Sequence, residues 1–251
     1  NNLAVALGRM DRYSEALAAY ERCLQLLAAG GNADSARAGS AERGRALVLA
    51  RLERFDAAQG ALERARELRE RNLPPTHADH LDTQFAAIGL LRARGEIEAA
   101  HAAINALINA AGPEHQRIGE LRYERARIAV LRQDWRTAAS DFGLAATRLQ
   151  ALAGADNCLS IYARAAAAYA EFRLDGDSAG AETALARELR ALQALSLERL
   201  DEGAEILLMR AQIAHQAGRL ADAQRFRDAA LAIYAALQLR APADLLARSG
   251  S

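Results

Sequence analysis

Residues 176–180 read Gly-Asp-Ser-Ala-Gly, which matches the G-x-S-x-G pattern of the nucleophile elbow in serine hydrolases. In that elbow the serine follows a buried β-strand and precedes a helix, so that a strained turn aims its hydroxyl at an oxyanion hole. The residues before Gly176, YARAAAAYAEFRLD, are helix formers and include no β-branched side chain. The stretch therefore predicts a turn between two helices, in which Gly176 ends the first helix and Ser178 is the N-cap of the second. We expect no hydrolase chemistry here.

A second group of candidate functional residues lies in the stretch THADHLD, which holds His77, Asp79, His80 and Asp82. Imidazole and carboxylate groups bind metal ions, but the stretch lacks the H-E-x-x-H spacing of a helical zinc site. It also lies where a helix is expected to begin, and Thr76 with Asp79 fits a capping box. Capping is the favoured interpretation, and we expect no metal site.

The charged residues restrict the chemistry further. All 32 basic residues are arginine, so a Walker A lysine and a Schiff-base lysine are both excluded from this chain. The 32 arginines balance 32 acidic residues, and a net charge of zero gives no electrostatic reason to expect nucleic acid or an anionic membrane as a partner. We therefore expect no catalytic residue, no cofactor and no enzyme activity in this segment.

Composition indicates helices in a folded protein. Half of the 251 residues are apolar (51%), only 5% are aromatic, and alanine recurs in runs, which favours helices packed at short distance. No apolar run reaches the length of about 20 residues that spans a bilayer, and no secretion signal opens the chain. Two lone cysteines, Cys23 and Cys158, are expected to be small core residues, and the expected location is the cytoplasm. Because the chain begins at Asn1 within a helical pattern, we expect a fragment of a longer protein.

The elements that position these residues repeat along the chain. Six times a helical run is followed by a polar turn, an anchor residue and, three places later, a small residue that opens a second helix. The anchors are Tyr13, Phe55, Ile97, Trp135, Ser178 and Leu220. The small residues are Ala16, Ala58, Ala100, Ala138, Ala181 and Ala223, at spacings of 42, 42, 38, 43 and 42. A period near 40 with two helices in each unit predicts an all-α helical solenoid.

The first copy, NNLAVALGRMDRYSEALAAYERCL, resembles the tetratricopeptide repeat. The matching residues are Asn2, Leu3, Tyr13, Ala16, Tyr20 and Leu24. The turn glycine of that family occurs at Gly95, Gly176 and Gly218 and is replaced by Asp11, Glu53 and Gln133 in the other copies. The long period and the P-x-H sequences in LPPTH and AGPEH are similar to the long-repeat variant of kinesin light chains and bacterial signalling proteins.

The resemblance implies a right-handed α-solenoid of six helix-turn-helix repeats that forms one domain over residues 1–251. The repeats are expected at about residues 1–30, 38–72, 78–110, 115–152, 157–195 and 199–238, with a C-terminal cap at 241–248.

The resemblance also implies a peptide-binding groove on the first helices, where Asn2 is expected to bind the backbone of a bound peptide. The groove positions carried over are Asn2, Arg9, Arg51, Asp82, Arg92, Glu124, Arg127, Arg173 and Gln212. The arginines suit partner carboxylates. The competing interpretation is a solvated charged face with helical i,i+4 pairs, as in ELRERN (residues 67–72).

Three functions remain open from the sequence. The first is a protein–protein interaction scaffold that binds a partner peptide or helix. The second is the C-terminal regulatory or sensor arm of a larger bacterial signalling protein, such as a Ser/Thr kinase or a transcriptional regulator. The third is an array that associates with itself through an uncapped N-terminal end.

Overall fold

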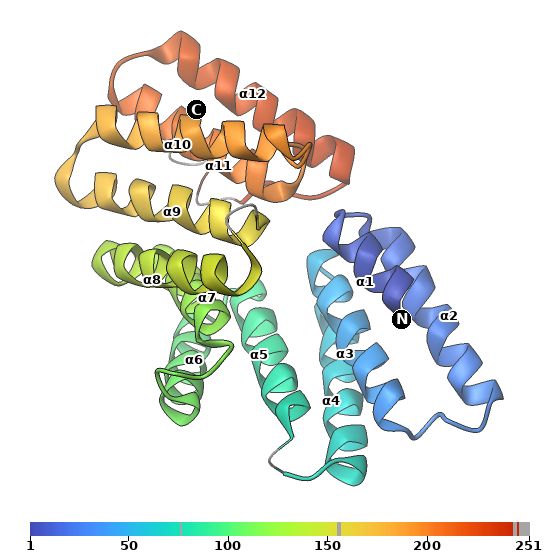
Figure 1. The fold of residues 1–251 in the computed structure, drawn as a ribbon. Helices are drawn as coiled ribbons and strands as arrows, with labels where there is room; N and C mark the ends of the chain where they lie inside the picture. The colour runs from blue at the N-terminus through green and yellow to red at the C-terminus, as the bar shows by residue number, and fades with distance from the viewer. Residues whose placement is uncertain (76, 155–156, 243–244, 246–251) are drawn as a thin grey trace. The chain divides into compact units, whose positions relative to one another are not determined.

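The computed structural model describes residues 1–75, 77–154, 157–242 and 245, and within these ranges the regular structure is entirely α-helical (Figure 1). The helices of the described chain are α1 (Asn2–Arg9), α2 (Tyr13–Ala29), α3 (Ala36–Arg51), α4 (Phe55–Asn72), α5 (Ala78–Ala93), α6 (Ile97–Ala111), α7 (Ile118–Leu131), α8 (Trp135–Ala153), α9 (Cys158–Asp175), α10 (Ser178–Ala194), α11 (Asp201–Gln216) and α12 (Leu220–Leu237). None of these helices combines the length and apolar character that crossing a membrane requires.

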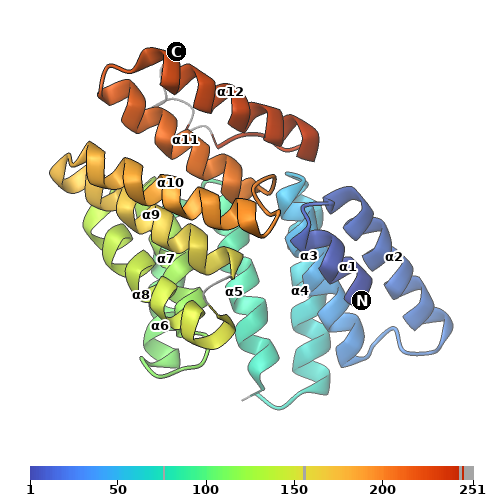
Figure 2. The ribbon, with the colours of Figure 1, turned by 45° about the horizontal axis from the view of Figure 1, so that its top comes forward.

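The chain divides into two compact units, Asn1–Leu107 and Ile108–Ser251, and the boundary falls within α6. In each unit, consecutive helices pack on one another; α3 packs on α4 in the first unit, and α11 lies beside α12 in the second (Figure 2). This confirms the all-α solenoid architecture of stacked helix pairs. The organisation as a single domain stays a prediction, and most of the expected cap at 241–248 lies outside the described residues.

The six second helices begin at the anchor residues, three positions before the small residues at which the repeat alignment expected them to open. Each anchor residue is the first residue of its helix, from Tyr13 in α2 to Leu220 in α12. The small residue three places later is buried in every copy, with an exposed fraction of at most 5%. An alanine at this place lets two helix backbones approach closely, and a larger side chain would hold them apart. The alignment that identified the repeats is therefore confirmed by the burial of its alanines.

The turns inside the hairpins share one backbone conformation. Six equivalent residues have a left-handed φ: Asp11 (55°), Glu53 (57°), Gly95 (79°), Gln133 (59°), Gly176 (80°) and Gly218 (73°). Glycine adopts this conformation without strain, whereas a residue with a Cβ atom does so at a cost. The three copies that lack glycine have therefore kept the turn at the expense of stability.

The left-handed conformation of Gln133 leads to a prediction about stability. Gln133→Gly is expected to raise the free energy of unfolding by about 0.5–1 kcal/mol, because glycine removes the left-handed strain of a residue with a Cβ atom. Urea denaturation followed by the fluorescence of Trp135 measures the change. The reciprocal variant Gly218→Gln should lose a similar amount, and equal stability of Gln133→Gly and the parent chain would contradict the argument.

GDSAG forms the fifth of these turns, as expected, but its capping residue differs. Gly176 ends α9 in the left-handed conformation, and α10 begins at Ser178. The N-cap is Asp177, whose carboxylate accepts a hydrogen bond from the backbone N–H of Gly180 at 3.0 Å. The prediction that Ser178 caps this helix is thus wrong by one residue, because a carboxylate at the preceding position reaches the free N–H groups first.

In the first unit, a glycine inside α3 lets two hairpins approach. A Cβ atom on Gly44 would overlap the ring of Tyr20 in α2, and that ring is buried. Glycine in a helix normally costs stability relative to alanine, so its presence here reflects packing rather than helix propensity.

Gly44→Ala is accordingly expected to lower the free energy of unfolding by about 1–3 kcal/mol through overpacking. Alanine at Gly60 is the matched control, since that position in α4 is exposed and a Cβ atom there meets no neighbour. Gly60→Ala should instead raise the free energy of unfolding by about 0.5–1 kcal/mol. Urea denaturation monitored by circular dichroism distinguishes the two, and a gain in both variants would contradict the packing argument.

Arg69 departs from the expected solvated face. It lies within ELRERN, yet only 1% of the residue is exposed. Its guanidinium donates to the backbone carbonyl of Asp79 and to the hydroxyl of Thr83 in α5, and one nitrogen lies 3.5 Å from the hydroxyl of Ser40 in α3. The solvated interpretation is therefore wrong for this residue, which joins three helices of the first unit.

In the second unit, aromatic rings fill the space between consecutive hairpins. Tyr123 of α7 meets Phe142 of α8 edge to face, with ring centroids 5.7 Å apart. Tyr162 of α9 contacts both rings, at 5.8 Å and 6.1 Å. Edge-to-face pairs add to the stabilisation that burial alone provides, so this cluster fixes the stacking of α7, α8 and α9.

Candidate functional site

The predicted groove positions of the first unit all lie on first helices of hairpins. Asn2 and Arg9 stand at the two ends of α1, and both side chains are exposed. Asp82 and Arg92 lie near the two ends of α5 and are half-buried. The exposed polar groups of α1 are thus open to a binding partner.

Arg51, at the end of α3, is engaged with the preceding hairpin. Its Nε atom donates to the hydroxyl of Tyr13 at 2.9 Å, and its guanidinium carbon lies 5.2 Å from the centroid of the same ring. The tyrosine hydroxyl in turn donates to the carboxylate of Asp11. Burial raises the pKa of Tyr13, and the charge of Arg51 opposes that shift. Arg51 therefore links the first two hairpins through the anchor residue of the first.

In the second unit, one predicted residue is part of a polar network across three hairpins. Arg127 of α7 is 3.4 Å from a carboxylate oxygen of Glu205 in α11. Tyr162 of α9, between them, donates its hydroxyl to the other oxygen of Glu205. Burial alone would lower the pKa of Arg127, but Glu205, Tyr123, Tyr162 and Glu124 together outweigh it and raise the pKa well above its ordinary value. Arg127 is a firmly held cation.

Sequence reasoning did not identify Glu205 or Tyr162 as members of this network. Glu205 is the single charged residue of the apolar run GAEILLM. A charge within an apolar run is the feature of the sequence that could have identified it as a buried polar contact. Glu124, a predicted groove residue on α7, is itself buried, with 6% of the residue exposed. A buried acidic residue needs a polar or charged partner. The sequence can therefore suggest that such a partner exists, but it does not identify the partner.

A second network connects Gln212 and Arg173. Gln212 of α11 is buried; its amide nitrogen donates to the backbone carbonyl of Leu245 at 2.6 Å, and its amide oxygen accepts from the hydroxyl of Tyr169 in α9. The same hydroxyl accepts a hydrogen bond from Arg173 at 3.2 Å. Gln212 thus orients Tyr169, which in turn orients Arg173.

Arg173 is also stacked on an aromatic ring. Its guanidinium carbon lies 4.4 Å from the centroid of the Trp135 ring, at the start of α8, and the Trp135 ring meets Tyr169 edge to face. A guanidinium over a tryptophan face gains cation–π attraction and loses few hydrogen-bond donors. The ring and the hydroxyl together hold the Arg173 side chain in one place.

Arg173 differs from other half-buried arginines of the second unit in the partners of its guanidinium. Arg125 pairs with Asp141, Arg164 with Glu188 and Arg210 with Glu182, at distances of 2.5–3.1 Å. No carboxylate within the described residues pairs with Arg173, whose partners are a hydroxyl and a ring. A positioned guanidinium with unused N–H donors is suited to a carboxylate from another molecule.

The two motifs that suggested chemistry have structural roles. GDSAG is a helix–turn–helix, and the strand that a nucleophile elbow requires before its serine is replaced by α9. In THADHLD, His77 is the N-cap of α5, with its Nδ1 accepting from the N–H of Asp79 at 3.2 Å. Thr76, expected to form the capping box, lies outside the described residues. Asp79 lies 3.4 Å from Arg69 and so pairs with the buried arginine.

The chain is similar in fold to known repeat proteins. A family model for the tetratricopeptide repeat matches residues 1–71. No curated protein sequence matches the chain. Similar solved structures include a putative kinesin light chain from Podosopora anserina with nearly identical TPR-like repeats, which is 14% identical with a TM-score of 0.53 and covers 79% of this chain and 95% of that one. BtubC (BKLC) from P. vanneervenii is 14% identical with a TM-score of 0.59, covering 93% of this chain and 92% of that one. At this identity the likeness concerns the fold alone.

Proposed function

We propose that this chain, whose residues 1–71 match the tetratricopeptide-repeat family, is an interaction scaffold that binds a segment of a partner protein along the first helices of its hairpins. Repeats of this kind present extended surfaces that suit a peptide or a helix. The proposal assigns no catalytic step to the chain. The observation that carries it is Arg173, a cation held between Trp135 and Tyr169 with no carboxylate partner in the described chain.

Arg173 is proposed to bind a carboxylate of the partner, from an acidic side chain or a C-terminus. A carboxylate accepts two parallel N–H bonds from one guanidinium, which fixes orientation as well as adding affinity. Because Trp135 and Tyr169 already restrain the arginine, little side-chain entropy remains to be lost on binding. Charge-assisted hydrogen bonds of this kind contribute about 1.5–3 kcal/mol, or roughly 10- to 100-fold in affinity.

The other predicted groove residues divide into two groups in this proposal. Asn2, Arg9, Asp82 and Arg92 stay predicted contacts for the rest of a partner segment. Arg51, Arg127 and Gln212 bind side chains of neighbouring helices and Glu124 is buried, so we assign these four the role of positioning helices and side chains. Gln212 acts in this way on Arg173 through Tyr169.

A random-peptide phage library panned against the chain tests the proposal. The selected peptides are expected to share an acidic residue or a free carboxylate terminus. Fluorescence anisotropy with the synthetic peptides then measures affinity for the parent chain and for Arg173→Gln. We expect Arg173→Gln to weaken binding at least about 10-fold, because it removes the charged donor and keeps a polar side chain.

The matched control is Arg190→Gln, since Arg190 is an exposed arginine on the neighbouring helix α10. It should bind the peptides like the parent chain. Replacing the peptide carboxylate by an amide should remove most of the difference between the parent chain and Arg173→Gln. Peptides without a carboxylate, or equal losses in both arginine variants, would overturn the assignment of Arg173.

A further inference from the structure

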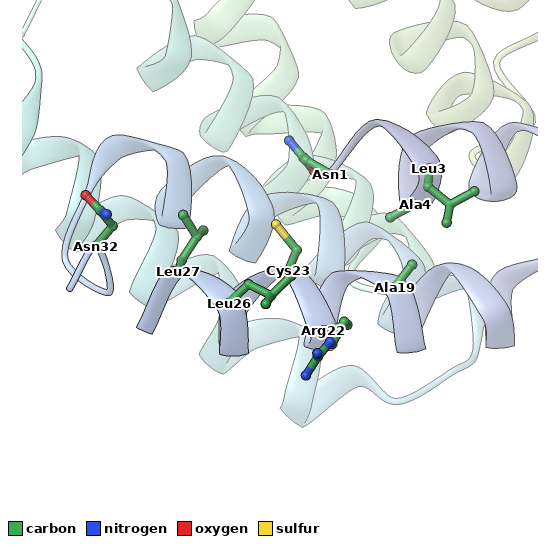
Figure 3. Close-up of a pocket in the computed structure, with 9 residues that line it drawn as sticks. All are labelled: Asn1, Leu3, Ala4, Ala19, Arg22, Cys23, Leu26, Leu27 and Asn32. Atoms are coloured by element: carbon green, nitrogen blue, oxygen red, sulfur yellow. The ribbon is translucent and has the colours of Figure 1, made fainter. Parts of the chain in front are cut away.

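Two hollows of the first unit differ in the residues that line them. The hollow between α1 and α2 is lined mainly by apolar side chains such as Leu26 and Leu27 (Figure 3). The other, which we call the α4–α5 groove, has a volume of about 480 Å³ and combines an apolar floor with a polar rim. This volume lies within the range of about 300–1,000 Å³ that is typical of ligand sites. Its lining includes Leu62, Glu63 and Glu70 of α4 and His80, Thr83 and Ala87 of α5.

The preceding junction, between α2 and α3, shows how the equivalent space is closed. Helix α3 has Ala38, Ala41 and Gly44 at 15, 12 and 9 positions before its left-handed turn residue, and all three are buried. A Cβ atom on Gly44 would overlap the ring of Tyr20, so this ring lies directly against the backbone of α3. Small residues on α3 and a tyrosine on α2 therefore fill the junction between them.

The junction between α4 and α5 has neither feature. Helix α5 has the larger residues His80, Thr83 and Ala86 at the same 15, 12 and 9 positions before its turn residue. Side chains of this size keep α5 from approaching α4 as closely as α3 approaches α2. Opposite them, α4 has Leu62 at the position of Tyr20, nine residues after the turn (62 − 53 and 20 − 11). The groove is the space that an aromatic ring at this position would fill.

The second unit also has a ring at this position. Phe142 of α8 lies nine residues after the left-handed Gln133 (142 − 133), and its side chain is buried. The centroid of its ring is 6.1 Å from that of Tyr162 in the next first helix, α9. Of these three junctions, the one between α4 and α5 is therefore the one in which the chain has no ring nine residues after the turn.

The polar residues of the groove indicate which kind of ring it suits. His80 is half-buried, and its Nε2 atom is buried without a hydrogen-bond partner among the described residues. Rotation of the imidazole toward the groove would give this nitrogen a partner there, and a phenol hydroxyl suits either tautomer because it both donates and accepts. The exposed rim carries Glu63, Glu70 and Arg66, a net negative charge that disfavours an anionic group.

We infer that the α4–α5 groove binds a tyrosine side chain of a partner protein. The ring lies against Leu62 and Ala87, as the ring of Tyr20 lies against α3, and the hydroxyl bonds to Nε2 of His80. One wall of the groove is α4, which is a second helix of a hairpin, so the site is distinct from the first-helix surface of the proposed function. The inference does not depend on peptide binding by Arg173.

A titration of the full chain with N-acetyltyrosinamide, followed by proton NMR, tests the inference. The chain has only 5 histidines, so their imidazole Cε1–H signals can be resolved, and His80→Gln assigns the signal of His80. This signal should shift saturably, whereas that of His215, exposed on α11, serves as the reference that stays in place. N-acetylphenylalaninamide lacks the hydroxyl and should bind about 2- to 10-fold more weakly, the effect of one neutral hydrogen bond.

Two variants locate the bound ring. Leu62→Tyr combined with Ala86→Gly repeats the Tyr20–Gly44 pair inside the groove and should weaken binding at least about 10-fold, with circular dichroism as the check on folding. Leu144→Tyr is the matched control, because Leu144 is an exposed leucine on α8, and it should bind like the parent chain. In His80→Leu, the ring signals of the two amides should report equal affinities, because the partner of the hydroxyl has been removed.

Three outcomes would overturn the inference. The first is a His80 signal that does not shift, and the second is equal affinity of the parent chain for the tyrosine and phenylalanine amides. The third is binding of p-cresol without binding of N-acetyltyrosinamide, which would assign the groove to a free phenol rather than to a tyrosine of a protein. If the Leu62→Tyr, Ala86→Gly chain does not fold, the comparison of His80→Leu with the parent chain decides.

Discussion

Arg69→Ala is expected to lower the free energy of unfolding by about 3–5 kcal/mol, the usual cost of breaking a buried ionic interaction. The side chain is almost fully buried and connects α3, α4 and α5 through Ser40, Asp79 and Thr83. Its removal leaves a cavity and takes the donors away from a buried hydroxyl and a backbone carbonyl. Burial lowers the pKa of Arg69, and the carboxylate of Asp79 opposes that shift.

Two further variants make this prediction specific. Arg66→Ala is the matched control, because Arg66 lies on the same helix with 65% of its side chain exposed, and its loss should stay within about 0.5 kcal/mol. Arg69→Met keeps the buried stem without the charge and should lose less than Arg69→Ala, as hydrophobic replacements of buried ions often do. Urea denaturation followed by circular dichroism compares the three. Equal losses for Arg69→Ala and Arg66→Ala would contradict the role of Arg69 as a connection between hairpins.

Glu205→Ala is the second large effect, with an expected loss of about 3 kcal/mol from the free energy of unfolding. Glu205 is 7% exposed and its carboxylate accepts from Arg127 and Tyr162, so its removal leaves a cation and a phenol hydroxyl without this partner. Because about a fifth of the Arg127 side chain is exposed (22%), water replaces part of the lost interaction, which places the expected cost at the low end for buried pairs.

Trp135 is the single tryptophan of the chain and reports on the second unit directly. Its fluorescence should show that Glu205→Ala unfolds at a lower urea concentration than the parent chain. Glu171→Ala should unfold at the same urea concentration as the parent chain, since Glu171 is an exposed carboxylate on α9. The double variant Glu205→Leu with Arg127→Met should recover much of the loss, because apolar replacement of both partners leaves no unpaired charge. A double variant as unstable as Glu205→Ala would mean that packing, and not the unpaired cation, determines the cost.

The sequence by itself determined the helical hairpins, because the signals that specify them are local. Anchor residues such as Tyr13, alanines such as Ala138 and left-handed turn residues such as Gly176 lie within a few positions of the turn they form. Their recurrence at a nearly constant period predicted that there are six second helices and placed the start of each within three residues. The same locality explains why GDSAG could be recognised as a turn without knowledge of the rest of the fold.

Only the tertiary structure decided which polar residues are exposed and which are buried. Arg127 and Glu205 are 78 residues apart and meet because successive first helices stack. The pattern of polar and apolar residues along either helix does not indicate which residue of another helix it will contact. Arg69 looks like any other arginine of ELRERN until α5 covers it. Arg173 differs from these arginines, since stacking places a ring and a hydroxyl beside it but no carboxylate of the described residues. A side chain's burial depends on helices that are distant in sequence, whereas a turn depends on its neighbours along the chain.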